Sequence, residues 1–327
     1  MRIVMLGTGP YAVPLLSQVD ESSHQVAALF TRPERQRDSV GAILPSPMRQ
    51  RAEQSGTPIY APEDINHESS HNLLTELHAD LFVVCDYGQI LSPSTLGLAP
   101  RGGLNLHASL LPKYRGAAPI HWAIYHGASE TGNTVIQMNA GMDAGPIVAQ
   151  ESIAIGPEET TPELEVRLAE RGSLLVLEVI EKLGRGDLQS RPQDLQAMTA
   201  APKLKKADGH IDWNRSARAI KNQIRAMVPW PRTFTHYLPA EGRPQRVIIA
   251  KAAVLTEKEL PEYSASSTPA GTVLQADRDC LLIETGQDLL QLLQLQPAGK
   301  KMLAADEFLR GYRPKVGDRF GSFSEAP

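Results

Sequence analysis

The chain has 327 residues, of which 42% are hydrophobic and 21% are charged, and its formal net charge is −4. This length exceeds what one hydrophobic core usually serves, so two domains are expected, and the composition excludes a disordered chain. The net negative charge disfavours a nucleic-acid partner, but it hides an asymmetry: from Lys203 onward 19 Lys and Arg stand against 14 Asp and Glu.

The first half alternates short apolar runs with amphipathic ones. Apolar runs at 3–6, 26–30 and 81–85 are typical of strands buried on both faces of a parallel sheet. Helical patterns lie around 10–19, 45–54 and 69–79, and a long helix is expected over 161–183. Strand and helix alternation predicts an α/β domain.

The second half has a different pattern. Residues 187–208 carry prolines and lysines with little apolar periodicity, which is typical of a linker. Beyond them come a helix near 215–227 and short strands at 246–255, 271–275, 280–284 and 289–295. Short strands separated by Gly and Pro predict a small β-barrel. The predicted domains are 1–189 and 209–327, joined by a linker at 190–208.

No apolar run reaches the roughly 18 residues of a membrane span, and the apolar start of the chain resembles a first strand more than a signal peptide. The two cysteines, Cys85 and Cys280, form neither a disulfide framework nor a metal-binding cluster. These features predict a cytoplasmic protein with no membrane partner and no metal.

The glycines that follow the first strand fit a dinucleotide-binding pattern. Residues 7–12 read Gly-Thr-Gly-Pro-Tyr-Ala between a predicted strand and helix, as in a turn that holds a pyrophosphate. The second strand ends at Arg32 with no acid placed for a ribose hydroxyl, although Arg32 suits a 2′-phosphate. The alternatives are an NADP-linked dehydrogenase and an ordinary tight turn.

The stretch from Asn105 to Ile120 contains the strongest candidates for catalytic residues. In a strand over 103–107, Asn105 and His107 point to the same face and emerge near the carboxyl end, where open α/β sheets build their sites. Asp143 lies in a Gly-Met-Asp-Ala-Gly turn that can bring it to His107. Taken singly, each of these residues has an ordinary structural explanation, but an amide, an imidazole and a carboxylate at one sheet edge form a candidate catalytic group.

This stretch resembles the folate-dependent formyltransferases, whose Asn, His and Asp triad falls on Asn105, His107 and Asp143. The resemblance implies formyl transfer, which is an acyl transfer, with Asn105 as oxyanion donor, His107 as proton carrier and Asp143 orienting His107. The likeness covers nearly the whole chain and is greatest to the methionyl-tRNA formyltransferases, through Arg-Gly-Ala-Ala-Pro-Ile at 115–120, Pro-Trp-Pro at 229–231 and Leu-Gln-Pro-Ala-Gly-Lys-Lys-Met at 295–302. It implies a Rossmann-like domain followed by an OB-like β-barrel.

The resemblance also implies ligands. The donor would be 10-formyltetrahydrofolate, with no NAD(P), and the acceptor initiator methionyl-tRNA, with no obligate protein partner and a monomeric enzyme. The predicted folate residues are Tyr87, Gly88, Ser109, Leu110, Leu111 and Pro112. The predicted tRNA contacts are Arg32, Arg35, Arg37, Lys203, Lys205, Lys206, Lys300 and Lys301, with Arg310 and Arg313 on the same path.

Three departures from the family pattern stand out. The loop at 31–47 has fewer Gly, Lys and Arg than usual, Asp86 replaces a small residue, and Gly9 replaces a proline. Two further alternatives remain: a formyltransferase acting on a nucleotide sugar, and a catalytically inactive tRNA-binding protein.

Overall fold

The computed structural model describes residues 1–34, 44–255 and 268–323. The chain forms two compact units. Unit 1 comprises Met1–Ile120, Ser129–Ile155 and Glu163–Lys203, and unit 2 comprises His121–Ala128, Gly156–Pro162 and Leu204–Pro327. The predicted 190–208 linker therefore crosses from one unit to the other, and the domain bounds proposed from the sequence stay a prediction.

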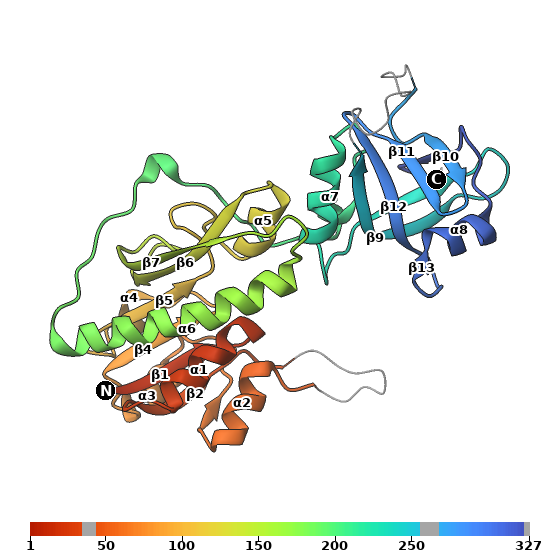
Figure 1. Ribbon diagram of the computed structural model, residues 1–327. Coiled ribbons are helices and arrows are strands. Elements are labelled where there is room, and N and C mark those ends of the chain that lie inside the picture. The colour runs from red at the N-terminus through yellow and green to blue at the C-terminus, as the bar shows by residue number, and fades with distance from the viewer. Residues whose placement is uncertain (35–43, 256–267, 324–327) are drawn as a thin grey trace. The chain divides into compact units, whose positions relative to one another are not determined.

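Unit 1 is built on a mostly parallel sheet with strand order β3-β2-β1-β4-β5-β6-β7 (Figure 1). The parallel part comprises β1 (Arg2–Gly7), β2 (Gln25–Phe30), β3 (Ile59–Tyr60), β4 (Leu81–Cys85) and β5 (Gly103–His107). β6 (Glu130–Gln137) runs antiparallel to β5, and β7 (Ile147–Ala154) runs antiparallel to β6. The central strands are buried almost throughout, as their apolar runs predict.

Short helices follow the strands of unit 1. They are the 3-10 turn η1 (Pro10–Ala12), α1 (Val13–Asp20), α2 (Pro47–Ser55), α3 (Glu68–Glu76) and α4 (Pro93–Leu96). α5 (Pro119–Tyr125) begins in unit 1, and its residues from His121 onward belong to unit 2. Local chemistry starts α2, since the Ser46 hydroxyl accepts the Arg49 amide hydrogen and Pro47 occupies the first turn. Gly56 ends it in the left-handed conformation.

The long helix α6 (Thr161–Arg185) covers one face of the first sheet. A Cβ on Gly172 would lie 2.9 Å from the Leu106 side chain, so α6 packs closely where Leu106 points. Alternate strand residues point to opposite faces, so Asn105 and His107 point away from α6. Three short segments continue the chain: η2 (Leu195–Ala197), η3 (Lys206–Gly209) and α7 (Ala217–Ala226).

Unit 2 contains an antiparallel sheet with strand order β10-β11-β12-β9-β8-β14. Its strands are β8 (Phe234–Leu238), β9 (Gln245–Leu255), β10 (Val273–Asp277), β11 (Cys280–Glu284), β12 (Leu289–Pro297), β13 (Leu303–Ala304) and β14 (Arg319–Gly321), with α8 (Ala305–Tyr312) before the last. The Val273 amide donates to Asp318 O at 2.8 Å and the Gly317 amide donates to Val273 O at 2.9 Å. These bonds join the β10 side of the sheet to the β14 side, so the sheet curls into a small barrel.

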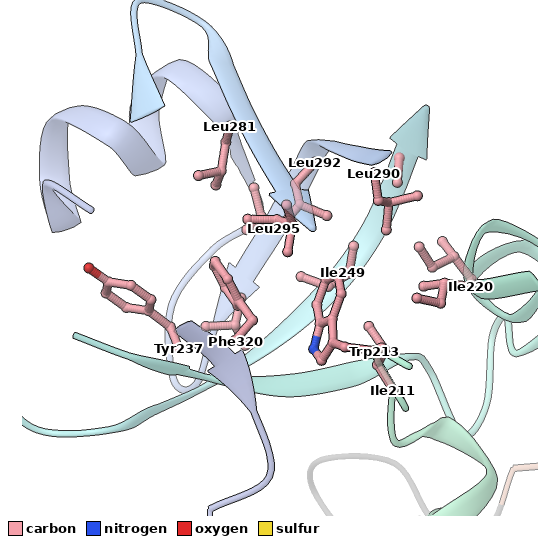
Figure 2. Close-up of a cluster of buried hydrophobic side chains, with 14 of the residues drawn as sticks. Ile211, Trp213, Ile220, Tyr237, Ile249, Leu281, Leu290, Leu292, Leu295 and Phe320 are labelled. Carbon is pink, nitrogen blue, oxygen red and sulfur yellow. The ribbon is translucent and has the colours of Figure 1, made fainter. Parts of the chain in front are cut away.

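The barrel encloses an apolar core. Trp213, Ile249, Leu292 and Phe320 point toward one another from different elements (Figure 2). The indole nitrogen of Trp213 donates to the Thr235 hydroxyl at 3.0 Å, which satisfies its one polar group inside this core.

The fold class predicted from the sequence is confirmed: an α/β unit with a mostly parallel sheet comes before a small β-barrel. Within the described residues, no helix is long and apolar enough to cross a membrane.

Candidate active site

The carboxyl edge of the first sheet brings Asn105 and His107 together. Both lie on β5, where Asn105 pairs with Val84 of the parallel strand β4 and His107 pairs with Thr134 of the antiparallel strand β6. They are two residues apart, so their side chains leave the same face. His107 is buried and Asn105 is half-buried.

Asp143 closes the group from the turn between β6 and β7. Its backbone has φ 49°, in the left-handed region that suits a tight turn between glycines. Its Oδ1 accepts the Asn105 amide at 3.4 Å and lies 3.6 Å from His107 Nδ1, while its Oδ2 accepts the Gly116 amide at 2.9 Å. The structure therefore brings the three predicted catalytic side chains together.

The second ring nitrogen of His107 is fixed by the backbone. Nε2 lies 2.9 Å from the carbonyl oxygen of Tyr114. A carbonyl only accepts, so Nε2 carries a hydrogen in this arrangement. Nδ1, which faces Asp143, is therefore the ring nitrogen at which His107 can gain or lose a proton.

The predicted folate residues at 109–112 form a tightly bonded turn beside the triad. The buried Ser109 hydroxyl donates to Lys113 O at 2.6 Å, and the Leu111 amide donates to the Thr134 hydroxyl at 3.1 Å. Leu111 packs in a small apolar cluster, whereas Leu110 and Pro112 keep part of their surface exposed. Ser109 and Leu111 thus hold the turn, and the role of all four residues toward folate remains a prediction.

Tyr87 and Gly88 follow β4 at the same sheet edge. The Tyr87 ring is buried in the sheet core, and its hydroxyl has no hydrogen-bond partner among the described residues. Burial raises the pKa of this hydroxyl, so it stays protonated at neutral pH. Gly88 has φ 77°, and a Cβ there would lie 3.1 Å from the Arg32 guanidinium. Their predicted role toward folate remains a prediction.

Two of the departures from the family pattern, Gly9 and Asp86, lie in direct contact with each other. A Cβ on Gly9 would lie 1.8 Å from Asp86 Oδ2, so the carboxylate occupies the space that a side chain at position 9 would need. Asp86 is exposed as a residue, but desolvation by the protein around its carboxyl raises the pKa of that carboxyl to about 6. A hydrogen bond from the Gly9 backbone and the charge of Arg32 oppose this shift. The glycine pattern at 7–12 thus has a structural explanation without a dinucleotide.

The predicted tRNA residues are scattered over both units. Arg32 lies over Gly88 at the sheet edge, and Arg35 and Arg37 lie outside the described residues. The remaining predicted lysines and arginines are exposed: Lys203, Lys205, Lys206, Lys300, Lys301, Arg310 and Arg313. Two of them have acidic neighbours, since Lys301 lies 3.8 Å from Glu307 and Arg310 lies 2.7 Å from Asp306. Their contact with tRNA remains a prediction.

Three residues at the site were not predicted from the sequence. Tyr114 acts through its carbonyl and Gly116 through its amide, and neither role leaves a side-chain signal. Gln193 donates to the backbone of the Asp143 turn from a segment that was predicted as a linker. Within the described residues, no group of His, Cys, Asp and Glu is arranged to hold a metal ion.

Comparison with known proteins identifies the family. Residues 1–180 match the formyl transferase family, and residues 203–313 match the formyl transferase C-terminal domain. The methionyl-tRNA formyltransferase of Rhodopirellula baltica is 42% identical over 98% of this chain and 96% of its own length. This chain belongs to the formyl transferase family, among its methionyl-tRNA formyltransferases. The Citrifermentans bemidjiense member is 38% identical over 98% of this chain and 96% of its own.

Solved structures of the wider family share the fold. WlaRD, a sugar 3N-formyl transferase solved with dTDP and 5-N-formyl-THF, has a TM-score of 0.63 at 17% identity, covering 92% of this chain and 99% of its own. HypX from Aquifex aeolicus, in complex with tetrahydrofolic acid, has a TM-score of 0.61 at 17% identity, covering 97% of this chain and 48% of its own. Membership of the formyl transferase family sets aside the dehydrogenase alternative that the glycine pattern had raised.

Proposed function

We propose that this chain transfers the formyl group of 10-formyltetrahydrofolate to the amino group of methionyl-initiator tRNA, which yields formylmethionyl-tRNA for translation initiation. The observation that carries the proposal is the meeting of Asn105, His107 and Asp143 at the carboxyl edge, in a chain similar to methionyl-tRNA formyltransferases along nearly its whole length.

The reaction makes a bond between the amino nitrogen and the formyl carbon and breaks the bond from that carbon to the folate nitrogen. One proton leaves the amine and one reaches the folate nitrogen, while negative charge grows on the formyl oxygen. A site for this reaction needs a hydrogen-bond donor for the oxygen and a group that exchanges protons.

Asn105 is suited to be the donor. Its amide carries two N–H groups, and only one is directed at Asp143, over a long 3.4 Å contact. The other can point at the formyl oxygen, a role worth about 10²–10³ in rate when one such donor is removed.

His107 and Asp143 are suited to handle the proton. The Tyr114 carbonyl fixes the ring through Nε2, and Asp143 faces Nδ1, so ring orientation is set before substrate arrives. Proton transfer by a positioned histidine typically contributes about 10²–10⁴ in rate.

The donor binds, on this proposal, beside the turn at 109–112, where Leu110 and Pro112 offer apolar surface next to the triad. The tRNA contacts are proposed for exposed basic residues in both units, with Lys300 and Lys301 on the barrel. We also propose that the protein acts in the cytoplasm, in keeping with two unpaired cysteines and a tRNA substrate.

The decisive experiment incubates pure protein with 10-formyltetrahydrofolate and methionyl-tRNA and measures formylmethionine after release from the tRNA. A UDP-amino sugar serves as the competing acceptor in a parallel reaction. Formylmethionine in the first reaction is the expected result. Formylation of the sugar alone, or of neither acceptor, would contradict the proposal.

A further inference from the structure

The segment after α6 (Figure 1, in green) forms backbone hydrogen bonds with β7 and with the loop that follows β5 before the chain enters unit 2. Arg191 exchanges two backbone hydrogen bonds with Ile147 of β7, at 2.8 and 2.9 Å. Further along, the Arg115 amide donates to Thr199 O at 2.9 Å and the Ala201 amide donates to Arg115 O at 2.7 Å. We call residues 191–201 the clasp segment, because both of its ends are bonded to the loops that carry the site.

Gln193 forms the centre of the clasp segment. Its Nε2 donates to Asp143 O at 2.8 Å and to Gly145 O at 2.7 Å. Its Oε1 accepts from Arg115, at 3.1 Å from Nε and 2.6 Å from Nη2. Both N–H groups and both lone pairs of the amide are thus used, so the orientation of this side chain is fixed.

The two loops that Gln193 joins are those that hold the catalytic pair. Asp143 and Gly145 belong to the turn that presents the carboxylate to His107. Arg115 follows Tyr114, whose carbonyl fixes the His107 ring and whose amide donates to the Thr199 hydroxyl at 2.8 Å. A shift of the clasp segment would therefore move the acceptors on both ring nitrogens of His107.

We propose that Gln193 is a positioning residue for formyl transfer, which holds the Asp143 turn and the Arg115 loop at the spacing that the His107–Asp143 pair requires. It touches no reacting atom and acts through Asp143. The inference rests on the proposed function, because the kinetics that test it are those of formyl transfer. A misplacement of about 1 Å at a site of this kind can cost about 10²-fold in rate.

The variant that isolates this role is Gln193→Glu. A glutamate keeps oxygen toward Arg115, but it places oxygen instead of N–H against the Asp143 and Gly145 carbonyls. The matched control is Gln196→Glu, the same chemical change in the same segment on an exposed side chain. Gln193→Met, which removes every hydrogen bond at similar length, serves if the glutamate variant does not fold.

The expected result is a fall in kcat of about 10-fold to 100-fold for Gln193→Glu, with KM for methionyl-tRNA and for the folate within about twofold of wild type. Gln196→Glu should keep wild-type kinetics. Gln193 acts by positioning the Asp143 carboxylate against His107, and Asp143→Asn already removes that carboxylate. In the Asp143→Asn background, Gln193→Glu should therefore cause little further loss of kcat. Wild-type kcat in Gln193→Glu, or a full multiplicative loss in the double variant, would overturn the proposal.

Amide hydrogen exchange tests the positioning role of Gln193 independently of the proposed function, because the measurement needs no substrate. Loss of the Gln193 bonds should speed amide exchange in peptides that cover 113–118 and 141–147, and the control should not. Unchanged exchange in Gln193→Glu and Gln193→Met would overturn the positioning role even if formylation is measured. If exchange is faster in these variants but the wild-type protein does not formylate methionyl-tRNA, the proposed function is contradicted, whereas the structural role of Gln193 in holding the two loops is not.

Discussion

At the scale of single residues, Asp143 is the centre of the hydrogen bonds in the candidate site. Its two oxygens face the Asn105 amide, the His107 ring and the Gly116 amide at once. Asparagine has the same shape but replaces one oxygen with a donor, which would face another donor on at least one side. These three contacts therefore require the two acceptor oxygens of a carboxylate at position 143, and not only a side chain of that shape.

We predict that Asn105→Ala and Asp143→Asn each lower the single-turnover rate of formyl transfer by about 10²-fold or more while tRNA binding changes little. Rapid-quench formylation and filter binding of methionyl-tRNA measure the two quantities. Near-normal single-turnover rates in both variants would remove these residues from the chemistry.

Asp86 supplies a residue-scale prediction about stability and pH. Its pKa is raised from 3.8 to about 6 in the folded protein, first by desolvation. The folded state therefore binds the proton more tightly than the unfolded state, and Asp86 contributes stability at low pH that is lost as pH rises from about 4 through about 6. Glu165 is shifted in the same direction, from 4.5 to about 6, by desolvation and by the charge of Asp86.

We predict that Asp86→Asn raises the Tm relative to wild type at pH 8 and that this difference shrinks toward pH 4, where the wild-type carboxyl is protonated in the folded state. Thermal melts across this range provide the measurement. Glu76→Gln, which removes an exposed carboxylate on α3, should show no such trend. A Tm difference for Asp86→Asn that is independent of pH would contradict the argument.

At the scale of elements, prediction from sequence succeeded where periodicity carries the signal. Helix α6 and strands β4, β9, β11 and β12 lie where apolar spacing places them. Strand β6 gave no such signal, because Thr131, Asn133 and Thr134 are polar yet buried, with Asn133 donating to Leu168 O. Buried polar residues that are satisfied by distant partners cannot be recognised from local pattern.

The residues of the candidate site also fall into those that the sequence predicted and those that it did not. Strand alternation placed Asn105 and His107 on one face, and the resemblance to formyltransferases pointed to Asp143. The clasp segment has no periodicity, so its composition indicated a linker, and its hydrogen bonds to the site run through backbone and one amide side chain. Contacts of that kind depend on tertiary structure alone.

Gly116 links the site loop to the clasp segment, and it provides the prediction at this scale. Its φ is 125°, and a Cβ would lie 2.5 Å from the backbone oxygen of Ala201. We predict that Gly116→Ala lowers the free energy of unfolding by about 1–3 kcal/mol and also lowers turnover, because the amide that binds Asp143 is displaced. Denaturant unfolding and formylation kinetics measure the two effects.

The control is Gly102→Ala, where φ is 67° and a Cβ would meet nothing within 4 Å. It carries the strain of a left-handed alanine without the close approach, so it should cost less stability and spare turnover. Equal losses of turnover in the two variants would show that backbone strain, and not the contact with Ala201, governs the effect.

At the scale of the whole molecule, the charge distribution determines how a protein with net charge −4 meets a polyanion. The part from Lys203 onward carries an excess of basic residues, and Lys203, Lys205, Lys206, Lys300 and Lys301 are exposed there. Binding through phosphates releases counterions, so the affinity must fall as salt rises, with a log–log slope set by the number of phosphates that the protein neutralises.

We predict a clearly negative salt slope for methionyl-tRNA binding, and a slope shallower by about one unit in each of Lys300→Ala and Lys301→Ala, because each variant leaves one phosphate without its lysine. Lys251→Ala removes an exposed charge from β9 as the control and should leave the slope unchanged if binding is local to the predicted path. Filter binding from about 50 to 200 mM salt covers the range where such contacts change affinity most visibly. A slope near zero in the wild type would mean that the basic excess is not used for tRNA, and recognition would then have to rest on the aminoacyl end held at the Asn105–His107–Asp143 edge.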